Sequence, residues 1–520
     1  MSTKCPDLLG PQVAPRLLLT THMKMSQNPS SRQTSLVRRG LNHVVTGWIL
    51  TALLSVSGLL AAALWLAVAM GALKSEPAAT SLFTATDSSV VAPLTQSLQA
   101  PPGTLLDGLQ VNPFLLGVVG KENAPTETIA NNPVFDREHV LDDVENRIDR
   151  QFEVSPTLRD RVGFWFDVYT KYDQNHRIIH HQRYPWIIYK VVDVSEIINA
   201  NVPRVRWLRN VKADKFVKSE TLKVRATLLK LAKGLSPSKL SDDEKPVAEA
   251  LLRLNKNLKK TAREALSDLR VQTGQRNFFV EGLQISPRYL SSMEKIFRAK
   301  KLPIELTRLP FVESSFNKKA VSKVGASGIW QFMGDTGRKF LIVDGKIDER
   351  RSPFKASEAA AMLLKENHMI LSHSWPLAVT AWNHGPAGVR KACKAARSKD
   401  LGTIVARYRS RSFDFASSNF YSEFLGALYA ERYHDLIFGR LDREAELEPT
   451  IVRVQKAVRL SDIVRSSGLT IDEFLIMNPD LADIAKSNSF LPVGFRIHLP
   501  ERARVGVESV VSAEHIARAY

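Results

Sequence analysis

Cysteine is scarce in this 520-residue sequence, which contains only Cys5 and Cys393. Two cysteines at that separation provide neither a disulfide framework nor a CxxC metal site. The motifs of nucleic-acid binding are missing too: there is no zinc-type Cys/His spacing, no GxxxxGK[ST] phosphate loop and no RNP-like aromatic stretch. We therefore expect no metal and no cofactor, and no nucleic acid among the partners of this chain.

Acidic residues are also in short supply, with 53 Asp and Glu against 72 Lys and Arg, which gives a net charge of +19. A balance this basic favours polyanionic partners, and with nucleic acid set aside these are anionic lipid or an anionic cell-wall polymer. The charge indicates a compartment rather than an activity. The length predicts more than one domain and is ample for a large buried core.

Charge is absent altogether from residues 44–73, VVTGWILTALLSVSGLLAAALWLAVAMGAL. About 20 apolar residues span a bilayer, whereas the core of a signal peptide usually has only about 7–15. We expect a transmembrane anchor there and a basic cytoplasmic tail at 1–43, because the Lys/Arg excess lies before the apolar run. Small residues at 67–69 leave a cleaved signal open as the alternative. Residues 74–130, rich in Ser, Thr, Ala and Pro, predict a flexible linker.

Residues 131–285 predict a mostly helical N-terminal region whose role the sequence does not reveal. The elements that we expect are a helix at 137–152, a strand-forming run at 177–195, and two long helices at 204–233 and 241–270. His180 and His181 fall within the strand-forming run. Adjacent strand residues point to opposite faces, so we expect structural histidines rather than a metal pair.

A single carboxylate stands out in the stretch 303–333. Glu313 lies among the apolar residues Leu309, Pro310, Phe311, Val312 and Phe316. Apolar surroundings desolvate the charged form, so the pKa rises and the group stays protonated near neutral pH, as a general acid must. The alternative is a surface glutamate at a helix end. Glu305 is the rival for the acid, and Asp335 is expected to cap a helix at GDTG rather than to act directly in catalysis.

The surrounding segment, 286–440, predicts a nearly all-α domain. Ser286 and Pro287 have the pattern of a helix start, an N-cap serine followed by proline at the first helical position. Further helices are expected from Ser357 onward, over 376–385 and over 419–433.

Four motifs follow one another in this domain: Glu313-Ser314, then Gly325-Ala-Ser-Gly328-Ile-Trp330-Gln331-Phe332-Met333, then Ala381-Trp-Asn383-His-Gly385, then Asn419-Phe-Tyr421. In that order and spacing the segment resembles the catalytic domain of soluble-type (family 1) lytic transglycosylases, and most of all the membrane-bound murein transglycosylase D branch. Domains of that family are similar in fold to goose-type lysozyme. The resemblance implies cleavage of the β-1,4 bond between N-acetylmuramic acid and N-acetylglucosamine in peptidoglycan, without water and with a 1,6-anhydromuramoyl product.

The resemblance also assigns roles. Glu313 is the catalytic residue, first as general acid and then as base toward the muramic-acid C6 hydroxyl, so no second carboxylate is required. The residues expected to bind substrate or to support Glu313 are Ser314, Gly328, Trp330, Gln331, Phe332, Asn383, Gly385 and Tyr421. Tyr421 is expected to orient Glu313, and the aromatic rings either stack on sugars or pack in the core. Two departures stand out: the family's Ala-Tyr-Asn-Ala-Gly is Ala-Trp-Asn-His-Gly here, and no Val-Pro follows the late tyrosine.

Residues 450–501 predict a small β-α-α-β unit, with helices at 461–467 and 471–477 and a closing strand at 495–499. This order resembles a LysM module, which implies binding to N-acetylglucosamine chains. The usual Gly-Asp-Thr is replaced by Ala457-Val458-Arg459, which leaves the fold better supported than the sugar binding. Residues 502–520 are expected to be a tail.

The expected fold class is mainly α: a transmembrane helix, a helical N-terminal region, a lysozyme-like (SLT-type) helical catalytic domain and a LysM-like β-α-α-β domain. The expected function is a peptidoglycan lytic transglycosylase of the bacterial cell envelope, anchored in the inner membrane with its catalytic domain in the periplasm, or secreted there if the N-terminus is cleaved. Its partners are then glycan strands and the membrane. A non-catalytic peptidoglycan-binding scaffold and a hydrolytic muramidase are the alternatives.

Overall fold

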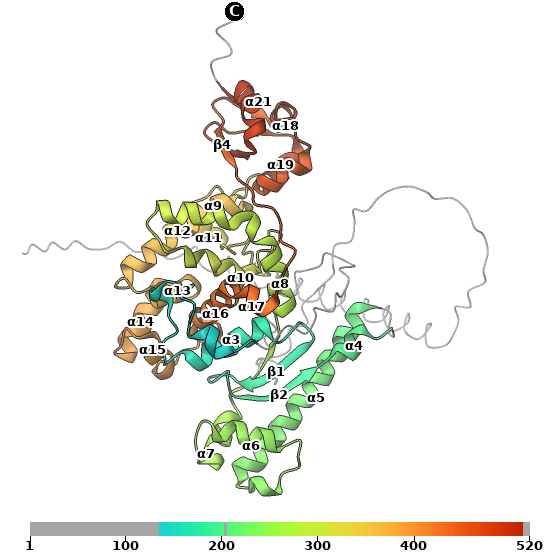
Figure 1. The fold of residues 1–520 in the computed structure, drawn as a ribbon, viewed down its shortest axis with the longest axis vertical. Helices are drawn as coiled ribbons and strands as arrows, with labels where there is room; N and C mark the ends of the chain where they lie inside the picture. Colours follow the sequence, from blue (N-terminus) through green and yellow to red (C-terminus); the bar gives the residue numbers. More distant parts are fainter. Residues whose placement is uncertain (1–134, 202–204, 513–520) are drawn as a thin grey trace, which may run out of the picture. The chain divides into compact units, whose positions relative to one another are not determined.

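The computed structural model describes residues 135–201 and 205–512 (Figure 1). The tail at 1–43, the anchor at 44–73 and the linker at 74–130, all inferred from sequence, lie outside these residues. Among the described residues, none of the helices has both the length and the apolar character needed to cross a membrane.

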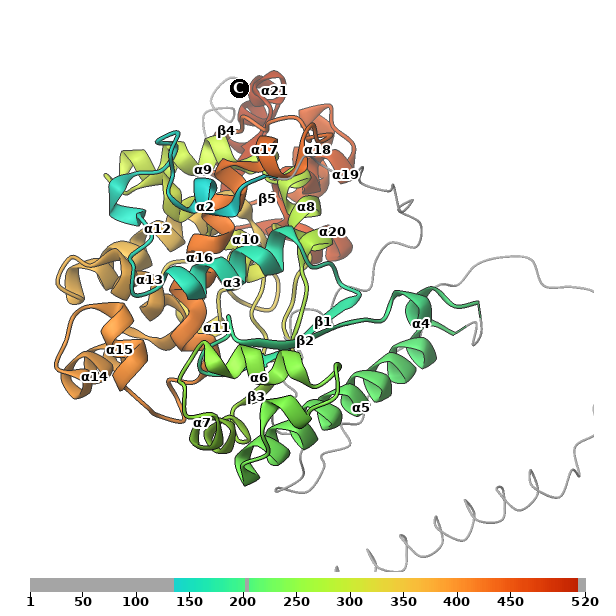
Figure 2. The same ribbon diagram turned by 60° about the horizontal axis from the view of Figure 1, so that its bottom comes forward.

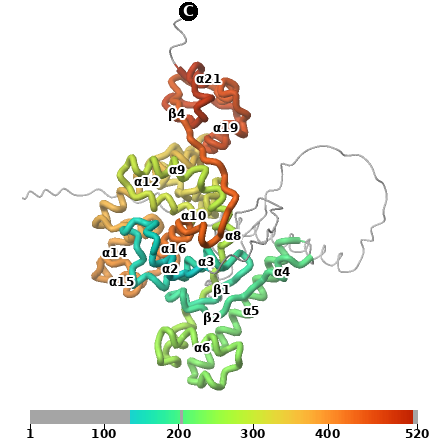
Figure 3. Tube along the Cα trace, in the orientation of Figure 1, coloured from blue at the N-terminus to red at the C-terminus, as the bar shows by residue number. Residues whose placement is uncertain are grey.

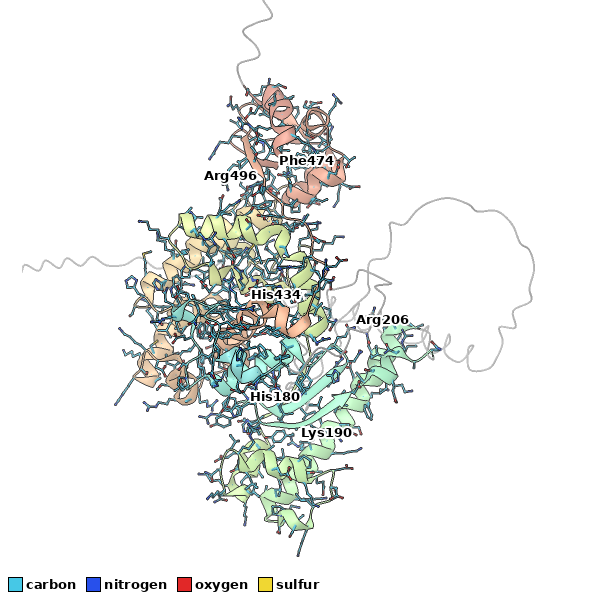
Figure 4. The ribbon with its side chains drawn as sticks, viewed as in Figure 1. His180, Lys190, Arg206, His434, Phe474 and Arg496 are labelled. Carbon is cyan, nitrogen blue, oxygen red and sulfur yellow. The ribbon has the colours of Figure 1, made fainter. Side chains whose placement is uncertain are left out.

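The first part of the described chain combines helices with one three-stranded sheet. Its elements are α2 (Arg137–Leu141), η2 (Arg150–Phe152), α3 (Arg159–Thr170), β1 (His176–His181), β2 (Ile188–Asp193), α4 (Ser195–Asn199), α5 (Arg206–Lys233), η3 (Pro237–Lys239), α6 (Lys245–Leu252), α7 (Leu258–Ala265), β3 (Leu269–Thr273) and α8 (Arg276–Ile285). The sheet has the antiparallel order β2-β1-β3. Figure 4 labels His180 on β1 and Lys190 on β2.

The two faces of this sheet have different neighbours. Ile178 of β1 packs in a cluster with Phe164 and Trp165 of α3, whereas Ile179 packs with residues of α5, α6 and α7. The histidines follow the same alternation, since His180 contacts Phe164 and His181 contacts Tyr184. Burial lowers the pKa of His180 to about 3 and that of His181 to about 4, which keeps both neutral. Both histidines are buried against neighbouring rings, as structural residues are. Within the described ranges, no group of three or more His, Cys, Asp and Glu residues could hold a metal ion.

Two helices expected in this region are interrupted. The helix at 137–152 ends at Leu141, because the Asp143 carboxylate accepts the backbone N–H groups of Arg147 and Ile148 and offers the chain a turn instead. The helix at 241–270 divides into α6 and α7, with Asn257 capping the start of α7. Its last residues pair with β1 as strand β3.

The next part is helical, as expected. Its elements are α9 (Pro287–Ala299), η4 (Ile304–Arg308), α10 (Leu309–Ser314), α11 (Gly334–Gly337), η5 (Glu349–Arg351), α12 (Pro353–Ile370), α13 (Trp375–His384), α14 (Pro386–Ala396), α15 (Leu401–Arg407), α16 (Phe415–Arg432) and α17 (His434–Phe438). Most of α16 is buried, and it lies beside α3, α10 and α13 (Figure 2).

One hydrophobic core spans both parts. It joins residues between Val140 and Tyr169 to residues between Phe279 and Phe438. The boundary expected at 285/286 therefore runs through a shared core, to which α3 contributes Val162, Phe166 and Tyr169. Helix α3 lies beside α16 (Figure 3).

The C-terminal module has the expected β-α-α-β order with additions. Its elements are β4 (Thr450–Arg453), β5 (Val458–Arg459), α18 (Leu460–Ser467), α19 (Ile471–Met477), η6 (Pro479–Leu481), α20 (Ala482–Ser487), β6 (Phe490–Leu491), β7 (Arg496–Leu499) and α21 (Glu501–Val511). β4 and β7 pair antiparallel, as do β5 and β6. The expectation of a tail from 502 is wrong as far as Val511, because α21 buries Ala503, Val507 and Val511 in the module's core.

Candidate active site

Glu313 lies in the last turn of α10, a short helix with proline in its first turn and a left-handed residue, Ser315 (φ 49°), directly after it. The Glu313 side chain points into the protein, and the residue is only 8% exposed. Burial raises the pKa of Glu313 to about 8, with the neighbouring charge of Glu423 as a smaller cause in the same direction. The alternative of a surface glutamate is thus excluded, and the group is protonated at neutral pH.

Trp382 holds the Glu313 carboxyl in place. Its indole Nε1 donates to Glu313 Oε1 over 2.8 Å, and this hydrogen bond opposes the rise in pKa because it favours the charged form. Trp382 stands where the family pattern Ala-Tyr-Asn-Ala-Gly has tyrosine. The departure in the third motif thus places an indole donor beside Glu313.

Tyr421 does not have the contact expected of it. It is buried in α16 beside Phe424, and no hydrogen bond joins it to Glu313 in the described part of the chain. Its supporting role stays a prediction, while the donor that Glu313 does have, Trp382, comes from α13.

The glycine turn after Glu313 is held tightly. Gly328 has φ +75°, and a Cβ atom there would lie 1.9 Å from the backbone oxygen of Arg350. Only glycine fits such a position. Ser314 Oγ donates to the backbone oxygen of Ile329 over 2.9 Å, which ties α10 to the turn. The Arg350 guanidinium donates to the backbone oxygens of Gly325 and Phe332 from the other side.

Gln331 is part of the same turn and adopts a positive φ of 48°. Its side-chain nitrogen donates to the backbone oxygens of Gly328 and Ala320, and its side-chain oxygen is buried with no partner. An unpaired buried acceptor beside a candidate acid is an available partner for a ligand N–H or O–H group.

Trp330 and Phe332 pack in the core rather than lining an open surface. Trp330 is fully buried, stacks on Phe297 and donates to Ser357 Oγ. Both rings contact Trp382, with centroid separations of 5.6 and 5.1 Å. The structure therefore favours core packing over sugar stacking for Trp330 and Phe332. Both rings pack against Trp382, the hydrogen-bond donor to Glu313.

Asn383 and Gly385 lie at the end of α13. Asn383 is exposed, and its side-chain oxygen accepts a hydrogen bond of 2.8 Å from Ser417 Oγ of α16. His384 Nδ1 lies 3.1 Å from the same hydroxyl. Gly385, with φ +78°, ends α13 and begins α14. The exposed amide of Asn383 is thereby oriented by contacts that the sequence pattern did not predict.

A second carboxyl, Glu423, also lies near Glu313. It projects from α16, and Tyr169 of α3 donates its hydroxyl to Glu423 Oε1 over 3.2 Å. Burial raises the pKa of Glu423 to about 8, while the Tyr169 hydrogen bond and the Arg270 charge oppose the rise. The sequence analysis missed Glu423 and Tyr169. A signal was present, because Glu423 follows Tyr421 by two residues and, like Tyr169, has apolar neighbours of the kind that drew attention to Glu313.

The other two carboxylates considered in the sequence have ion partners. Glu305 is buried, and Arg432 lies 3.6 Å from its Oε1. Asp335 is almost fully exposed and pairs with Arg338, and it does not cap α11, whose N-cap is Met333. These pairings leave two carboxyls with raised pKa values beside Trp382 and Tyr169, namely Glu313, which is buried, and Glu423, which is half-buried.

A buried, protonated carboxyl oriented by one donor is the arrangement that glycosidases use for a general acid. The comparisons with known proteins agree. Residues 294–404 match the family model described as the transglycosylase SLT domain, and this segment contains Glu313, the glycine turn and the Asn383 motif. By this match, residues 294–404 are similar to a transglycosylase SLT domain.

Individual relatives cover small parts of the chain. The membrane-bound lytic murein transglycosylase D of Escherichia coli K12 is 33% identical over 107 residues, which are 20% of this chain and 24% of that protein. A putative tributyltin chloride resistance protein of an Alteromonas species is 31% identical over 99 residues, 19% of this chain and 48% of that protein. The chain thus spans between a quarter and a half of these relatives.

Among solved structures, the soluble lytic transglycosylase SLT70 of Escherichia coli is similar over 47% of this chain and 38% of that chain, at 19% identity and a TM-score of 0.25. A score this low carries no argument about the fold.

Proposed function

We propose that this chain is a peptidoglycan lytic transglycosylase. It cleaves the β-1,4 bond between N-acetylmuramic acid and N-acetylglucosamine and leaves a 1,6-anhydromuramoyl end. The observation that supports this most directly is the Glu313 carboxyl, which is buried in an SLT domain, has a pKa near 8 and accepts one hydrogen bond from Trp382. A carboxyl that is protonated at neutral pH can protonate a leaving oxygen.

The reaction balances with one carboxyl. Glu313 gives its proton to the glycosidic oxygen as the bond from that oxygen to C1 breaks, and N-acetylglucosamine leaves with a free hydroxyl. The C6 hydroxyl oxygen then bonds to C1, and its proton passes to the Glu313 carboxylate. The acid is restored and no water is consumed. Trp382 favours the carboxylate that exists between the two steps, since hydrogen bonds to a charged group are the stronger ones.

Glu423 tunes this cycle as a positioning residue. Its carboxyl faces Glu313 from α16, and the hydroxyl of Tyr169 and the charge of Arg270 face Glu423 in turn. The two carboxyls lose their protons over the same pH range, and ionisation of one disfavours ionisation of the other, so Glu423 moves the loss of the Glu313 proton to higher pH.

Substrate contacts follow from the exposed or unpaired groups around the acid. Asn383 presents its amide, Gln331 offers its unpaired oxygen, and Ser314, Gly328 and Gly385 fix the backbone that carries these groups. The N-acetyl and hydroxyl groups of the two sugars match these donors and acceptors. Trp330 and Phe332 support the position of Trp382.

A hydrolytic muramidase is the second candidate, and Glu423 is the observation that favours it. Hydrolases of this kind use two carboxyl groups around the bond, one of them as base or nucleophile. The product decides between the two, because hydrolysis leaves a reducing end and the lytic route leaves an anhydro end.

The N-terminal segment and the C-terminal module are consistent with a location in the cell envelope. We propose that residues 44–73 anchor it in the inner membrane, facing the periplasm, and that the C-terminal module is a LysM-like glycan-binding unit. The charge-free run and the basic residues before it support the anchor. The β-α-α-β order of the module supports the second assignment.

The test is digestion of purified murein by the full chain, followed by mass spectrometry of the released muropeptides. The unmodified protein (the parent) is expected to release muropeptides with anhydro ends, and Glu313→Gln is expected to release none. Glu366→Gln, on the exposed face of α12, is the matched control and is expected to behave as the parent does. Reducing ends would replace the proposal by the muramidase. Full activity of Glu313→Gln would show that another group is the acid, and absence of product from the parent would leave a binding scaffold.

A further inference from the structure

A cavity of about 60 Å³ lies where α3, the turn between β1 and β2, and the loop between α15 and α16 meet. Glu313 is not among its lining residues. Three arginines line the cavity, Arg161, Arg183 and Arg409, together with the carboxylates Asp268 and Asp414. The lining thus has one more positive than negative group.

Arg161 is the unusual member of this set. It is 5% exposed, and its guanidinium donates to the side-chain oxygen of Asn419 over 2.7 Å and to the backbone oxygen of Arg183 over 2.8 Å. No carboxylate bonds or pairs with it within the described ranges. Buried charges in proteins are normally paired, because an isolated one loses its hydration without compensation.

The neighbouring groups leave this charge unmatched. Arg183 donates to the backbone oxygen of Ala406, and its Nε atom is buried without a partner. Asp414 accepts from Gln182 over 2.9 Å, and the charge of Arg183 acts on Asp268. Each carboxylate already has a partner, whereas a buried N–H of Arg183 has none, and the Arg161 guanidinium lies over the Trp186 ring at 5.3 Å but has no carboxylate.

We infer that this cavity binds a carboxylate and that, given the proposed function, the carboxylate belongs to the peptide stem of peptidoglycan. One carboxylate supplies the missing negative charge and accepts from a guanidinium in the geometry that arginine favours. The volume is far below the roughly 300–1,000 Å³ of a pocket that encloses a whole ligand. The cavity therefore takes an end group of a larger molecule.

The cavity adjoins the sugar-binding residues of the proposed site. Its lining residue Phe413 packs edge-on against His384, with a centroid separation of 5.0 Å. His384 shares the Ser417 hydroxyl with Asn383. Asn383 is thus linked to the cavity wall through Ser417 and His384, and a stem peptide that branches from a glycan held at Asn383 can extend toward the cavity.

Binding of the stem is tested apart from catalysis. Titration calorimetry measures the affinity of the Glu313→Gln full chain for stem peptide released from murein by an amidase, for the same peptide with its carboxyls amidated, and for inorganic phosphate. Adding Arg161→Met or Arg409→Ala is expected to weaken binding of the free-acid peptide by about tenfold or more, as for other hydrogen bonds to charged groups. Arg409 is exposed, so its replacement leaves the core intact.

The neighbouring arginine Arg407, exposed and outside the cavity lining, provides the control Arg407→Ala. Unchanged affinity in both cavity variants would overturn the inference, and so would equal loss in Arg407→Ala. Tight phosphate binding without peptide binding would overturn the stem as the source of the anion.

The rate on stem-bearing strands divided by the rate on strands stripped of stems gives a second readout. The parent is expected to favour stem-bearing strands, and both cavity variants are expected to bring this ratio toward one. If the parent releases no product from either substrate, the proposed function fails, and calorimetry still decides whether the cavity binds the stem.

Discussion

The acid chemistry proposed for Glu313 depends on a few side chains around its carboxyl group. Burial raises the pKa of Glu313, Trp382 lowers it through a hydrogen bond, and the charge of Glu423 raises it again. Tyr169 and Arg270 act on Glu423 in the opposite sense to burial. Removing Glu423 and removing the Trp382 donor must therefore shift the pKa of Glu313 in opposite directions.

Glu423→Gln is expected to move the alkaline limb of the pH–rate profile to lower pH. The variant lacks the like charge that raises the pKa of Glu313, so the acid loses its proton earlier as pH rises. The measurement is anhydro-muropeptide release between about pH 5 and 9, where the bell-shaped profile reports such groups. An unchanged limb together with lower activity would mean that Glu423 has only a structural role.

Trp382→Phe is expected to move the same limb to higher pH and to reduce kcat. The carboxylate form loses its donor, so the proton is held more strongly and its transfer to the glycosidic oxygen in the first step becomes harder. Loss of one such donor typically lowers the rate by about 10²–10³-fold. A limb that moves to lower pH would contradict the assigned direction.

Glu313→Gln is expected to stabilise the fold, and more so at pH 8 than at pH 5. The native protein holds the proton up to about pH 8, whereas the unfolded chain releases it near 4.5. Between these values the native state binds more protons, so the free energy of unfolding falls as pH rises, by up to about 1.4 kcal/mol per pH unit. Glutamine removes this loss. Thermal melts of parent and variant at both pH values test it, and an equal difference at both would contradict it.

At the scale of elements, α10, α13 and α16 present the acid, its donor and the second carboxyl, and α3 supplies Tyr169. Helices α13 and α16 were predictable, because their apolar residues recur at helical spacing, whereas α3 and α10 were not among the expected helices. Helix boundaries elsewhere were less predictable, because they depend on single side chains. The Asp143 carboxylate forms the turn that ends α2 at Leu141, and Asn257 caps the start of α7. The glycine turn was visible in sequence, but its tight fit against Arg350 was not.

Gly328→Ala is expected to destabilise the domain by more than about 1–3 kcal/mol, the usual loss for one strained backbone position. The new Cβ would meet the Arg350 backbone oxygen at 1.9 Å as well as a φ of +75°. Gly325→Ala is the matched control, because its φ is +84° but nothing lies within 4 Å of the new atom. Thermal unfolding measures both, and equal losses would show that the close contact is unimportant.

At the scale of the whole chain, the SLT domain and the C-terminal module share a buried ionic contact. Lys355 of α12 is fully buried, and its Nζ lies 2.7 Å from Asp480 and 3.0 Å from Glu349. Phe354 stacks on His498 of β7 at the same contact, and Arg496, labelled in Figure 4, pairs with Glu358. The module is thus held through charges as well as through apolar packing.

Lys355→Met is expected to lower the free energy of unfolding by about 3–5 kcal/mol, because Asp480 and Glu349 lose their buried cation. Adding Asp480→Leu is expected to recover part of the loss, since replacing a whole buried pair by apolar groups is often neutral. Denaturant unfolding measures both variants. A single variant as stable as the parent would contradict the role of Lys355 in holding the module.

The sequence by itself determined which residues are able to act. The apolar neighbours of Glu313, the glycine turn and the family motifs are local in the chain, so the candidate acid, the match to an SLT domain and the helical fold were predictable. Tertiary structure alone decided which groups meet. Trp382, Glu423 and Tyr169 lie far from Glu313 in sequence, and no local pattern records the packing of α3, α13 and α16 that brings an indole donor and a second carboxyl to it. The same packing buried Arg161 without a carboxylate, because burial and pairing depend on contacts between distant elements.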